Sequence, residues 1–253
     1  RYGLNISAEN KNKPLFSIVT VVFNGDALIE KTIQSTIRQS LDNFEYIVID
    51  GNSQDKTLSI VKKYQKRIDT LISENDLGIY NAMNKGAKIS RGEYTIFLNC
   101  GDTFANKHTL QKIADSIINR DVDVVYGNVL KYSDNELVEK KAEKPGNKHR
   151  MYFCHQSCAI RTSVLQTNLF DEKYKMSSDF KLFKTLFKNN ATFYQVDFPI
   201  AIFDKSGISN SNRSEGLWEN IKVINECDKG IEWLRLMVRI LPSYLVAKLK
   251  SHF

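Results

Sequence analysis

Two aspartates follow apolar, β-branched runs of the kind that form buried strands. Asp50 ends the run FEYIVID (44–50), and Asp102 ends the polar turn after YTIFL (94–98). Ligands of open α/β sheets bind beyond the carboxyl ends of the strands, so Asp102 is placed to hold a metal ion or a phosphate. Asp50 is placed to accept a hydrogen bond from a base N–H. The alternative for both residues is a plain turn, in which the carboxylate is only a turn residue.

A third run, FSIVTVVFN (16–24), ends in an aromatic ring beside an amide. Phe23 can cover the face of a base, with Asn24 next to it. The sequence has neither the G-x-G-x-x-G motif of dinucleotide-binding enzymes nor the G-x-x-x-x-G-K-[ST] motif of P-loop NTPases, which argues against both classes. Together the three strand ends offer a stacking surface, a base-reading acceptor and a metal-binding carboxylate. These parts suit a nucleoside diphosphate held with a divalent ion.

Such a site needs parallel strands that end at one edge of a sheet. Through the first hundred residues, apolar β-branched runs alternate with segments whose apolar residues recur at helical spacing. The alternation predicts a parallel sheet with right-handed crossovers. Ser53 and Asp76 are the candidate N-caps of the second and third helices. The pattern predicts strands at 16–24, 44–50, 69–74 and 94–98, and helices at 27–40, 55–66 and 78–89.

After residue 105 the spacing of the pattern changes. The length of 253 residues suits one large α/β domain with appendages better than two equal domains. The rest of the chain predicts a helix at 109–119, a strand at 122–132, a charged mobile loop at 134–150, a strand at 153–161, a helix at 177–190, one or two strands at 191–203 and a helical remainder.

The net charge of +7 favours an anionic partner, which is a nucleotide phosphate, a lipid headgroup or a nucleic acid. No apolar run approaches the roughly 20 residues that a membrane-spanning helix needs. Four cysteines do not form a disulfide framework in a chain of this length, which suits a reducing compartment. Cys154 and Cys158 enclose His155, but C-x₃-C without a second pair is a poor zinc signature.

The chain resembles family 2 of the glycosyltransferases, whose fold is the α/β GT-A fold. The resemblance is dense over 15–105 and sparser over 150–210, and it is closest to bacterial enzymes that build capsule, O-antigen or exopolysaccharide repeat units. It implies a lead-in at 1–14, a nucleotide-sugar-binding half at 15–105, an acceptor-binding half at 106–210 and C-terminal helices at 211–253. The motifs that carry it are SIVTVVFN (17–24), YIVIDGNSQDKT (46–57), SENDLGIYNAMNKGAKISRGEYTIFLNCGD (73–102), HQS (155–157) and SSDF (177–180).

The resemblance implies an inverting transfer of a sugar from a nucleotide-diphosphate sugar, most commonly a UDP-sugar, to a hydroxyl of a saccharide or polyprenyl-linked saccharide. It further implies Mn²⁺ or Mg²⁺ as cofactor and a location in the cytoplasm or at the inner face of the cytoplasmic membrane. It implies no nucleic-acid partner, and it is compatible with an oligomer. The chain departs from the family's D-x-D-D or D-x-D metal motif. Asn99 and Gly101 replace two acidic positions, so Asp102 alone remains to bind the ion, with the donor's diphosphate and water completing its shell.

By the same resemblance, Asp179 in SSDF is the general base that takes the proton of the acceptor hydroxyl. Its alternative role is to favour the dipole at a helix start. His155 and Gln156 orient the acceptor or a phosphate, although His155 is equally well explained as a buried structural histidine. Lys205 is a candidate cation for the diphosphate or a solvated lysine. The nucleotide-binding residues implied are Thr20, Phe23, Asn24, Asp50, Asn84 and Lys85.

Two other classes fit part of the pattern. A sugar nucleotidyltransferase also binds nucleotides on an α/β sheet, but VVFNGDAL (21–28) lacks the Gly-rich, basic loop expected after its first strand. A non-enzymatic carbohydrate- or nucleic-acid-binding module is supported only by the charge. The segment 231–253 has apolar residues at helical spacing with basic flanks, so it either lies on a membrane surface or packs on the protein. Pro242 is expected to kink this helix or divide it in two.

Overall fold

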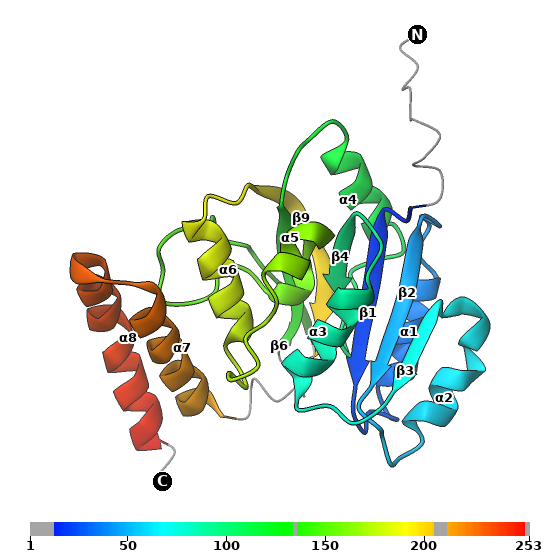
Figure 1. The fold of residues 1–253 in the computed structure, drawn as a ribbon, viewed down its shortest axis with the longest axis horizontal. Coiled ribbons are helices and arrows are strands. Elements are labelled where there is room, and N and C mark those ends of the chain that lie inside the picture. The colour runs from blue at the N-terminus through cyan, green and yellow to red at the C-terminus, as the bar shows by residue number, and fades with distance from the viewer. Residues whose placement is uncertain (1–12, 134–135, 205–211, 251–253) are drawn as a thin grey trace.

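The computed structural model describes residues 13–133, 136–204 and 212–250. In these residues nine strands form one mixed sheet in the order β3-β2-β1-β4-β8-β6-β9-β5, with β7 paired to β6. Helices flank the sheet (Figure 1). The strands are β1 (Phe16–Val22), β2 (Phe44–Asp50), β3 (Thr70–Ser73), β4 (Tyr94–Phe97), β5 (Thr103–Phe104), β6 (Val124–Ser133), β7 (Glu136–Lys140), β8 (Cys158–Arg161) and β9 (Phe193–Phe203).

Eight α-helices lie within the described residues, together with two short 3₁₀ turns, η2 (Gln65–Arg67) and η3 (His155–Ser157). The helices are α1 (Ile29–Ile37), α2 (Thr57–Lys63), α3 (Ile79–Ile89), α4 (Thr109–Ile117), α5 (Thr162–Thr167), α6 (Ser178–Lys188), α7 (Arg213–Cys227) and α8 (Gly230–Lys250).

The first four strands pair in parallel, as the alternation of strand and helix patterns predicts. Every residue of β1 is buried, which explains why its sequence is a continuous apolar run rather than an alternating one. Beyond β4 the sheet is mixed, because β8 is antiparallel to both β4 and β6, while β9 is parallel to β6. The carboxyl ends of β1, β2 and β4 therefore meet at one edge, where the polar turns follow.

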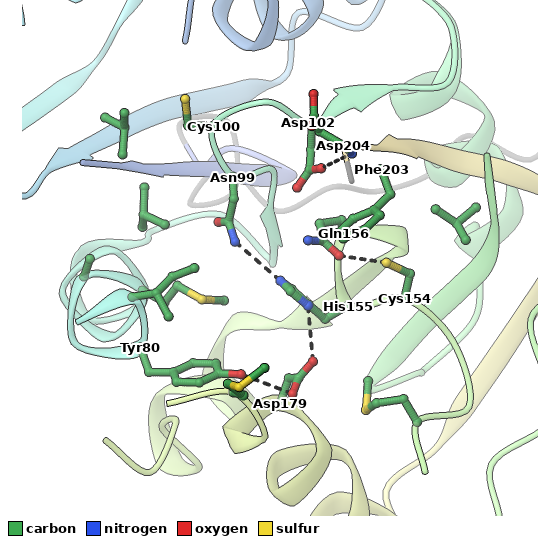
Figure 2. A pocket seen from close by; sticks show the side chains of 18 of the residues that line it. Tyr80, Asn99, Cys100, Asp102, Cys154, His155, Gln156, Asp179, Phe203 and Asp204 are labelled. Atoms are coloured by element: carbon green, nitrogen blue, oxygen red, sulfur yellow. Dashed lines mark hydrogen bonds and ion pairs between the residues drawn. The ribbon is translucent and has the colours of Figure 1, made fainter. Parts of the chain in front are cut away.

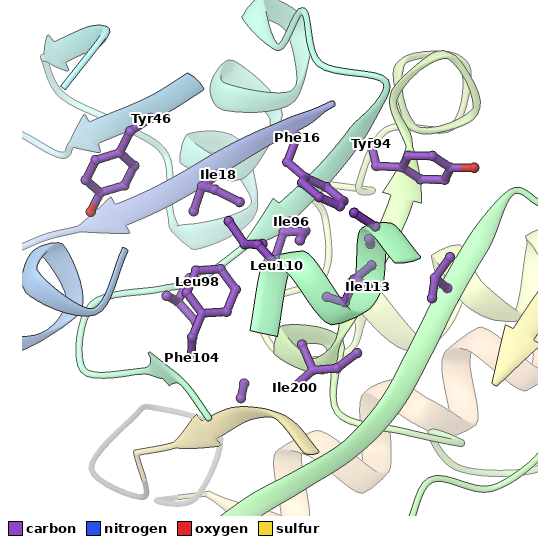
Figure 3. Close-up of a cluster of buried hydrophobic side chains, with 14 of the residues drawn as sticks. Phe16, Ile18, Tyr46, Tyr94, Ile96, Leu98, Phe104, Leu110, Ile113 and Ile200 are labelled. Carbon is purple, nitrogen blue, oxygen red and sulfur yellow. The ribbon is translucent and has the colours of Figure 1, made fainter. Parts of the chain in front are cut away.

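Separate apolar clusters fill the two faces of the sheet. One cluster joins side chains of β1 and β4, such as Ile18 and Ile96, to Leu110 and Ile113 of α4 and to α1 (Figure 3). The other joins β1, β2 and β4 to α3, α5 and α6. Gly86 lets α3 lie directly on the sheet, because a Cβ there would stand 2.4 Å from a methyl carbon of the neighbouring strand β1. Each face is thus covered by its own layer of helices.

The structure corrects several predicted elements. Residues 136–140, expected in a mobile loop, form the exposed strand β7, which pairs with β6. Only the last four residues of the predicted strand 153–161 are extended, because His155–Ser157 bend into η3. The helix α5 was not expected. Ser53 and Asp76 are not N-caps, since α2 begins after Lys56 and α3 begins after Gly78.

Helices α7 and α8 lie beside α6 at one end of the molecule, with α7 between the other two (Figure 1). A third apolar cluster joins them, in which Leu236 and Ile240 of α8 meet Ile221 and Ile224 of α7. The helix α8 continues through Pro242, so the expected division in two is wrong, because Tyr244 also packs on this cluster beyond the proline. Among the described residues, no helix combines the length and the apolar character of a membrane span.

Candidate active site

A cavity of about 620 Å³ opens at the edge where the parallel strands end. Its lining comes from both halves of the chain, so it joins the turns after β1 and β4 to α3, η3 and the first turn of α6. Figure 2 shows its polar side chains converging from these elements. Six of the candidate site residues that the sequence singles out lie in the lining: Phe23, Asn24, Asp102, His155, Gln156 and Asp179.

Asp102 lies at the inner end of this cavity and is only 3% exposed. Gly101 precedes it with a φ of +98°, a conformation that favours glycine, and Thr32 of α1 fixes the turn by donating to the Asp102 carbonyl at 2.8 Å. The carboxylate accepts the backbone N–H of Asp204 at 2.8 Å. Burial nevertheless raises the pKa of Asp102 to about 6, so its negative charge is incompletely compensated by the protein.

Asp179 faces the same cavity from the first turn of α6, with 14% of its side chain exposed. Its carboxylate accepts the Tyr80 hydroxyl at 3.2 Å and the Phe180 backbone N–H at 2.8 Å, and it lies 3.2 Å from Nδ1 of His155. Burial, followed by the charge of Asp179, raises the pKa of Tyr80, so this hydroxyl stays protonated and donates. The carboxylate is therefore held in one orientation by fixed donors.

His155 connects the two aspartate regions. Its Nδ1 faces Asp179, and its Nε2 lies 3.5 Å from the Asn99 side-chain amide (Figure 2). Each ring nitrogen thus faces a different partner, the carboxylate on one side and the amide on the other. The ring also lines the cavity.

Gln156 lies against Asp102, and its amide lowers the pKa of that carboxyl group, although less than burial raises it. Its side-chain oxygen accepts the Cys154 thiol at 2.8 Å. Burial raises the pKa of Cys154 to about 12 and that of Cys158 well above its usual value, so both thiols are neutral.

The cavity offers only a few side chains that could coordinate a divalent cation. Among residues 13–133, 136–204 and 212–250, no three His, Cys, Asp or Glu side chains gather in a way that could hold a metal. Asp102 is an undercompensated carboxylate, and the side-chain oxygen of Asn99 is buried without a hydrogen-bond partner in the same cavity. Both are the oxygen ligands that Mg²⁺ and Mn²⁺ prefer.

Two of the predicted nucleotide-binding residues lie in the cavity wall. Phe23 is 63% exposed, so its ring is open to a ligand. Asn24 takes a φ of 48°, and its side-chain oxygen accepts the Gln54 backbone N–H at 2.8 Å. Asp50 lies behind this wall at the end of β2, where its buried carboxylate accepts the hydroxyls of Ser53 and Ser73 at 2.5 and 2.6 Å.

Three other predicted residues point elsewhere. Thr20 donates to the Leu98 carbonyl inside the core. The Asn84 amide exchanges two hydrogen bonds with the backbone of Phe170, so it holds a loop rather than a ribose. Lys85 is bound to the Asn75 carbonyl and to the Glu74 carboxylate, both at 2.8 Å. None of the three belongs to the cavity lining. Lys205 lies outside the described residues.

The structure adds residues that the sequence did not single out. Tyr80 lies within the GIYNAMNKG motif. Its place among the apolar residues of α3 predicts a core residue and gives no sign of a contact with Asp179. Glu219 of α7 accepts three consecutive backbone N–H groups, from Lys175, Met176 and Ser177, at 2.8 to 2.9 Å. Only Ser178 separates these residues from Asp179. No local sequence pattern predicts the contact between Glu219 and residues 175–177, which lie far apart in the sequence.

This fold is the GT-A fold. S. aureus TarS, solved in complex with UDP, superposes with a TM-score of 0.65 at 21% identity, covering 91% of this chain and 70% of TarS. The mannosyltransferase PcManGT of Pyrobaculum calidifontis, solved with GDP-Man and Mn²⁺, gives a TM-score of 0.69 at 14% identity, covering 96% of this chain and 76% of PcManGT. The expected α/β GT-A fold is confirmed.

The chain belongs to glycosyl transferase family 2, whose sequence profile matches residues 17–187. A PGL/p-HBAD biosynthesis glycosyltransferase of Mycobacterium tuberculosis is 28% identical over 239 residues, which are 92% of this chain and 93% of the relative. An uncharacterised glycosyltransferase of Methanocaldococcus jannaschii is 29% identical over 196 residues, which are 72% and 68% of the two chains. The protein is thus a glycosyltransferase, and the nucleotidyltransferase and non-enzymatic alternatives are set aside.

Proposed function

We propose that this protein is an inverting glycosyltransferase that moves a sugar from a UDP-sugar to a hydroxyl of a saccharide or lipid-linked saccharide in bacterial surface polysaccharide synthesis. The observation that carries the proposal is the meeting of Asp102 and Asp179 in one cavity, with His155 between their regions. The likeness to TarS solved with UDP supports the donor, and the PGL/p-HBAD relative supports a role in building a glycoconjugate.

Asp179 is the proposed general base. An acceptor hydroxyl attacks the anomeric carbon, its proton passes to the Asp179 carboxylate, and the bond from that carbon to the diphosphate oxygen breaks. One displacement at the anomeric carbon gives an inverted product. The hydrogen bonds from Tyr80 and the Phe180 backbone hold the carboxylate, with His155 in contact, so no orientation has to be gained as the proton moves.

Residues 15–105 form the proposed donor half, and residues 106–210 the acceptor half. In the donor half, Phe23 covers the base, and Asp50 can exchange a serine hydroxyl for the N–H of uracil. Asp102 and the unpartnered oxygen of Asn99 would hold the divalent ion. When bound, this ion offsets the negative charge that grows on the departing diphosphate.

The acceptor side of the cavity is basic. Lys131, Lys140 and Lys175 belong to the lining, and the Lys131 ammonium lies 4.3 Å over the Phe203 ring. Aromatic and cationic side chains together suit a sugar that is attached to a phosphate group. This favours a phosphate-linked acceptor, as polyprenyl-linked saccharides are, over a neutral oligosaccharide.

The donor is tested by measuring nucleoside diphosphate release from UDP-, GDP- and dTDP-sugars with Mn²⁺ or Mg²⁺. UDP-sugars should be cleaved fastest, and the release should stop when the ion is chelated. Asp102→Ala should weaken ion-dependent binding of UDP rather than only the rate, because it removes the charged ligand of the ion. Equal binding of UDP by wild type and this variant with Mn²⁺ would exclude the metal role of Asp102, and a product with retained anomeric configuration would exclude inversion.

A further inference from the structure

The helix α8 carries two apolar faces on opposite sides. One face packs on α7, where Leu236 and Ile240 are 2% and 0% exposed and Met237 and Tyr244 are partly buried. This face explains how α8 packs on the protein. It does not explain why the opposite face of α8 is also apolar.

The opposite face, named here the outer stripe, consists of six exposed apolar residues spaced three or four positions apart. This spacing places them along one side of the helix over its whole length. Figure 1 shows α8 at the outer edge of the molecule, with no other helix or strand beyond it. The outer stripe comprises Ile231 (74% exposed), Leu234 (53%), Val238 (64%), Leu241 (38%), Leu245 (56%) and Leu249 (65%).

Basic side chains border the outer stripe. Arg235 and Arg239 each follow a stripe residue by one position, and Lys248 and Lys250 lie at its carboxyl end. Arg235 also pairs with Glu232 at 3.0 Å, one turn earlier on the helix. An exposed apolar band with a cationic border is the pattern of a helix that lies in a membrane interface.

A groove of about 470 Å³ lies where the start of α7 meets the second half of α8. Arg213 and Lys250 line it together with Val246, which is 54% exposed. Two cations beside an apolar side chain suit the headgroup phosphate of a lipid whose chains lie along the helix. The groove therefore extends the outer stripe toward α7.

We propose that the outer stripe and this groove form a docking surface for an anionic lipid membrane. A second copy of the chain is the rival occupant. In a symmetric helix pair the same face meets itself, which would bring the arginines of one copy toward the lysines of the other. Like charges at an apolar interface destabilise it, whereas anionic headgroups neutralise all four cations, and the net charge of +7 adds to the attraction.

The same helix α7 links this surface to the active site. Its Glu219 holds the loop 175–177, and its Gly216 lies beside Met176, whose methyl carbon is 3.5 Å from the position of a Cβ at that glycine. Lys175 and Met176 line the cavity. The helix that packs on the inner face of α8 thus also holds part of the cavity wall. This link rests on the proposed function, in which the acceptor is lipid-linked.

The test is flotation of the full chain with vesicles of phosphatidylcholine alone or mixed with phosphatidylglycerol. Wild type should bind the mixed vesicles, and less so as salt rises from about 0.1 M to 0.5 M. Leu245→Ser with Leu249→Ser should lower the partition coefficient at least about tenfold, because two large apolar groups are lost. Arg239→Glu with Lys250→Glu should abolish the preference for the anionic lipid.

The matched control is Ile118→Ser with Leu137→Ser, which removes two exposed apolar groups (58% and 45%) far from α8 in sequence. An equal loss of vesicle binding in this control would overturn the proposal. So would a stripe variant that turns a dimer into a monomer by light scattering while its vesicle binding stays at the wild-type level. UDP binding, measured on each variant, reports on the donor site alone, so a failure of the proposed donor is distinguishable from a failure of this surface.

Discussion

Asp179 is the proposed general base, and its neighbours hold its carboxylate in one orientation. Asp179→Asn keeps its shape and its hydrogen-bond acceptor but cannot take the proton of an acceptor hydroxyl. We expect transfer to fall by about 10² to 10⁴-fold, while UDP-sugar binding stays at the wild-type level. Turnover with a verified acceptor and calorimetry with the donor measure the two quantities. Asp115→Asn, an exposed carboxylate on α4, is the control, and unchanged turnover in Asp179→Asn would remove this residue from the mechanism.

Tyr80 donates one of the hydrogen bonds that hold Asp179. Tyr80→Phe removes this donor from the ionised carboxylate, so we expect kcat to fall by about 10-fold, the size of one hydrogen bond to a charged group. Tyr64→Phe is the control, since that hydroxyl donates to Glu30 on the surface. A change confined to KM would contradict this positioning role.

The sequence identifies several residues that line the cavity, but also several that do not. Asp102 lies in a turn after a predicted strand, and Asp179 lies at the start of a predicted helix. The position of each therefore follows from the elements around it. Thr20, Asn84 and Lys85 also lie on correctly predicted elements, but each has a protein partner outside the cavity. The choice between two available partners depends on tertiary packing, which no local pattern encodes.

At the scale of elements, α7 holds the loop 175–177, which leads into the helix of the proposed base. Glu219→Ala deprives three backbone N–H groups at 175–177 of their acceptor, so we expect amide exchange there to accelerate and kcat to fall more than UDP binding. Glu219→Gln keeps an acceptor oxygen and should restore part of the rate. Glu215→Ala, an exposed residue on the same helix, is the control. Unaltered exchange at 175–177 in Glu219→Ala would rule out the clamp.

Element boundaries were predictable where hydrophobic periodicity is strong. The second strand begins and ends at the predicted residues, and α3 and α6 begin within one residue of them. The predicted boundaries were wrong in polar segments. Residues 136–140 form β7 although all five are exposed, since their pairing with β6 comes from main-chain hydrogen bonds rather than burial. The bend at 155–157 has no apolar period of its own and is set by the cavity that it lines.

For the whole molecule, the fold class followed from the alternation of strands and helices, but the role of the C-terminal segment did not. The sequence presents one amphipathic pattern and two explanations, packing or membrane contact. The structure accounts for packing with Leu236 and Ile240 alone and leaves the outer stripe exposed. When a helix has apolar residues on two sides, the sequence alone does not show which side packs on the protein. The position of α7 decides this for α8.

A buried ion pair joins the body of the molecule to these helices. Lys184 of α6 and Asp228, between α7 and α8, lie 2.8 Å apart, and both side chains are 0% exposed. Asp228→Asn leaves the Lys184 charge buried without its counterion, so we expect a loss of about 3 to 5 kcal/mol in the free energy of unfolding. Urea denaturation measures it. Glu232→Gln, in the exposed pair with Arg235, should cost under about 1 kcal/mol.

The same pair predicts how stability depends on pH. Burial raises the pKa of Asp228, but hydrogen bonds from Lys184 and Lys188 outweigh it and hold the pKa below its usual range. Lys173 and Lys181 likewise overcome burial at Glu226 and lower its pKa to about 2. A carboxyl group with a lowered folded pKa stabilises the protein above its unfolded value of about 4, and this stabilisation is lost as the pH falls through the folded pKa. We therefore expect the free energy of unfolding to drop between about pH 4 and pH 2, and Asp228→Asn to flatten that drop. An identical slope in wild type and Asp228→Asn would show that the ion pair does not link the helices to the body in solution.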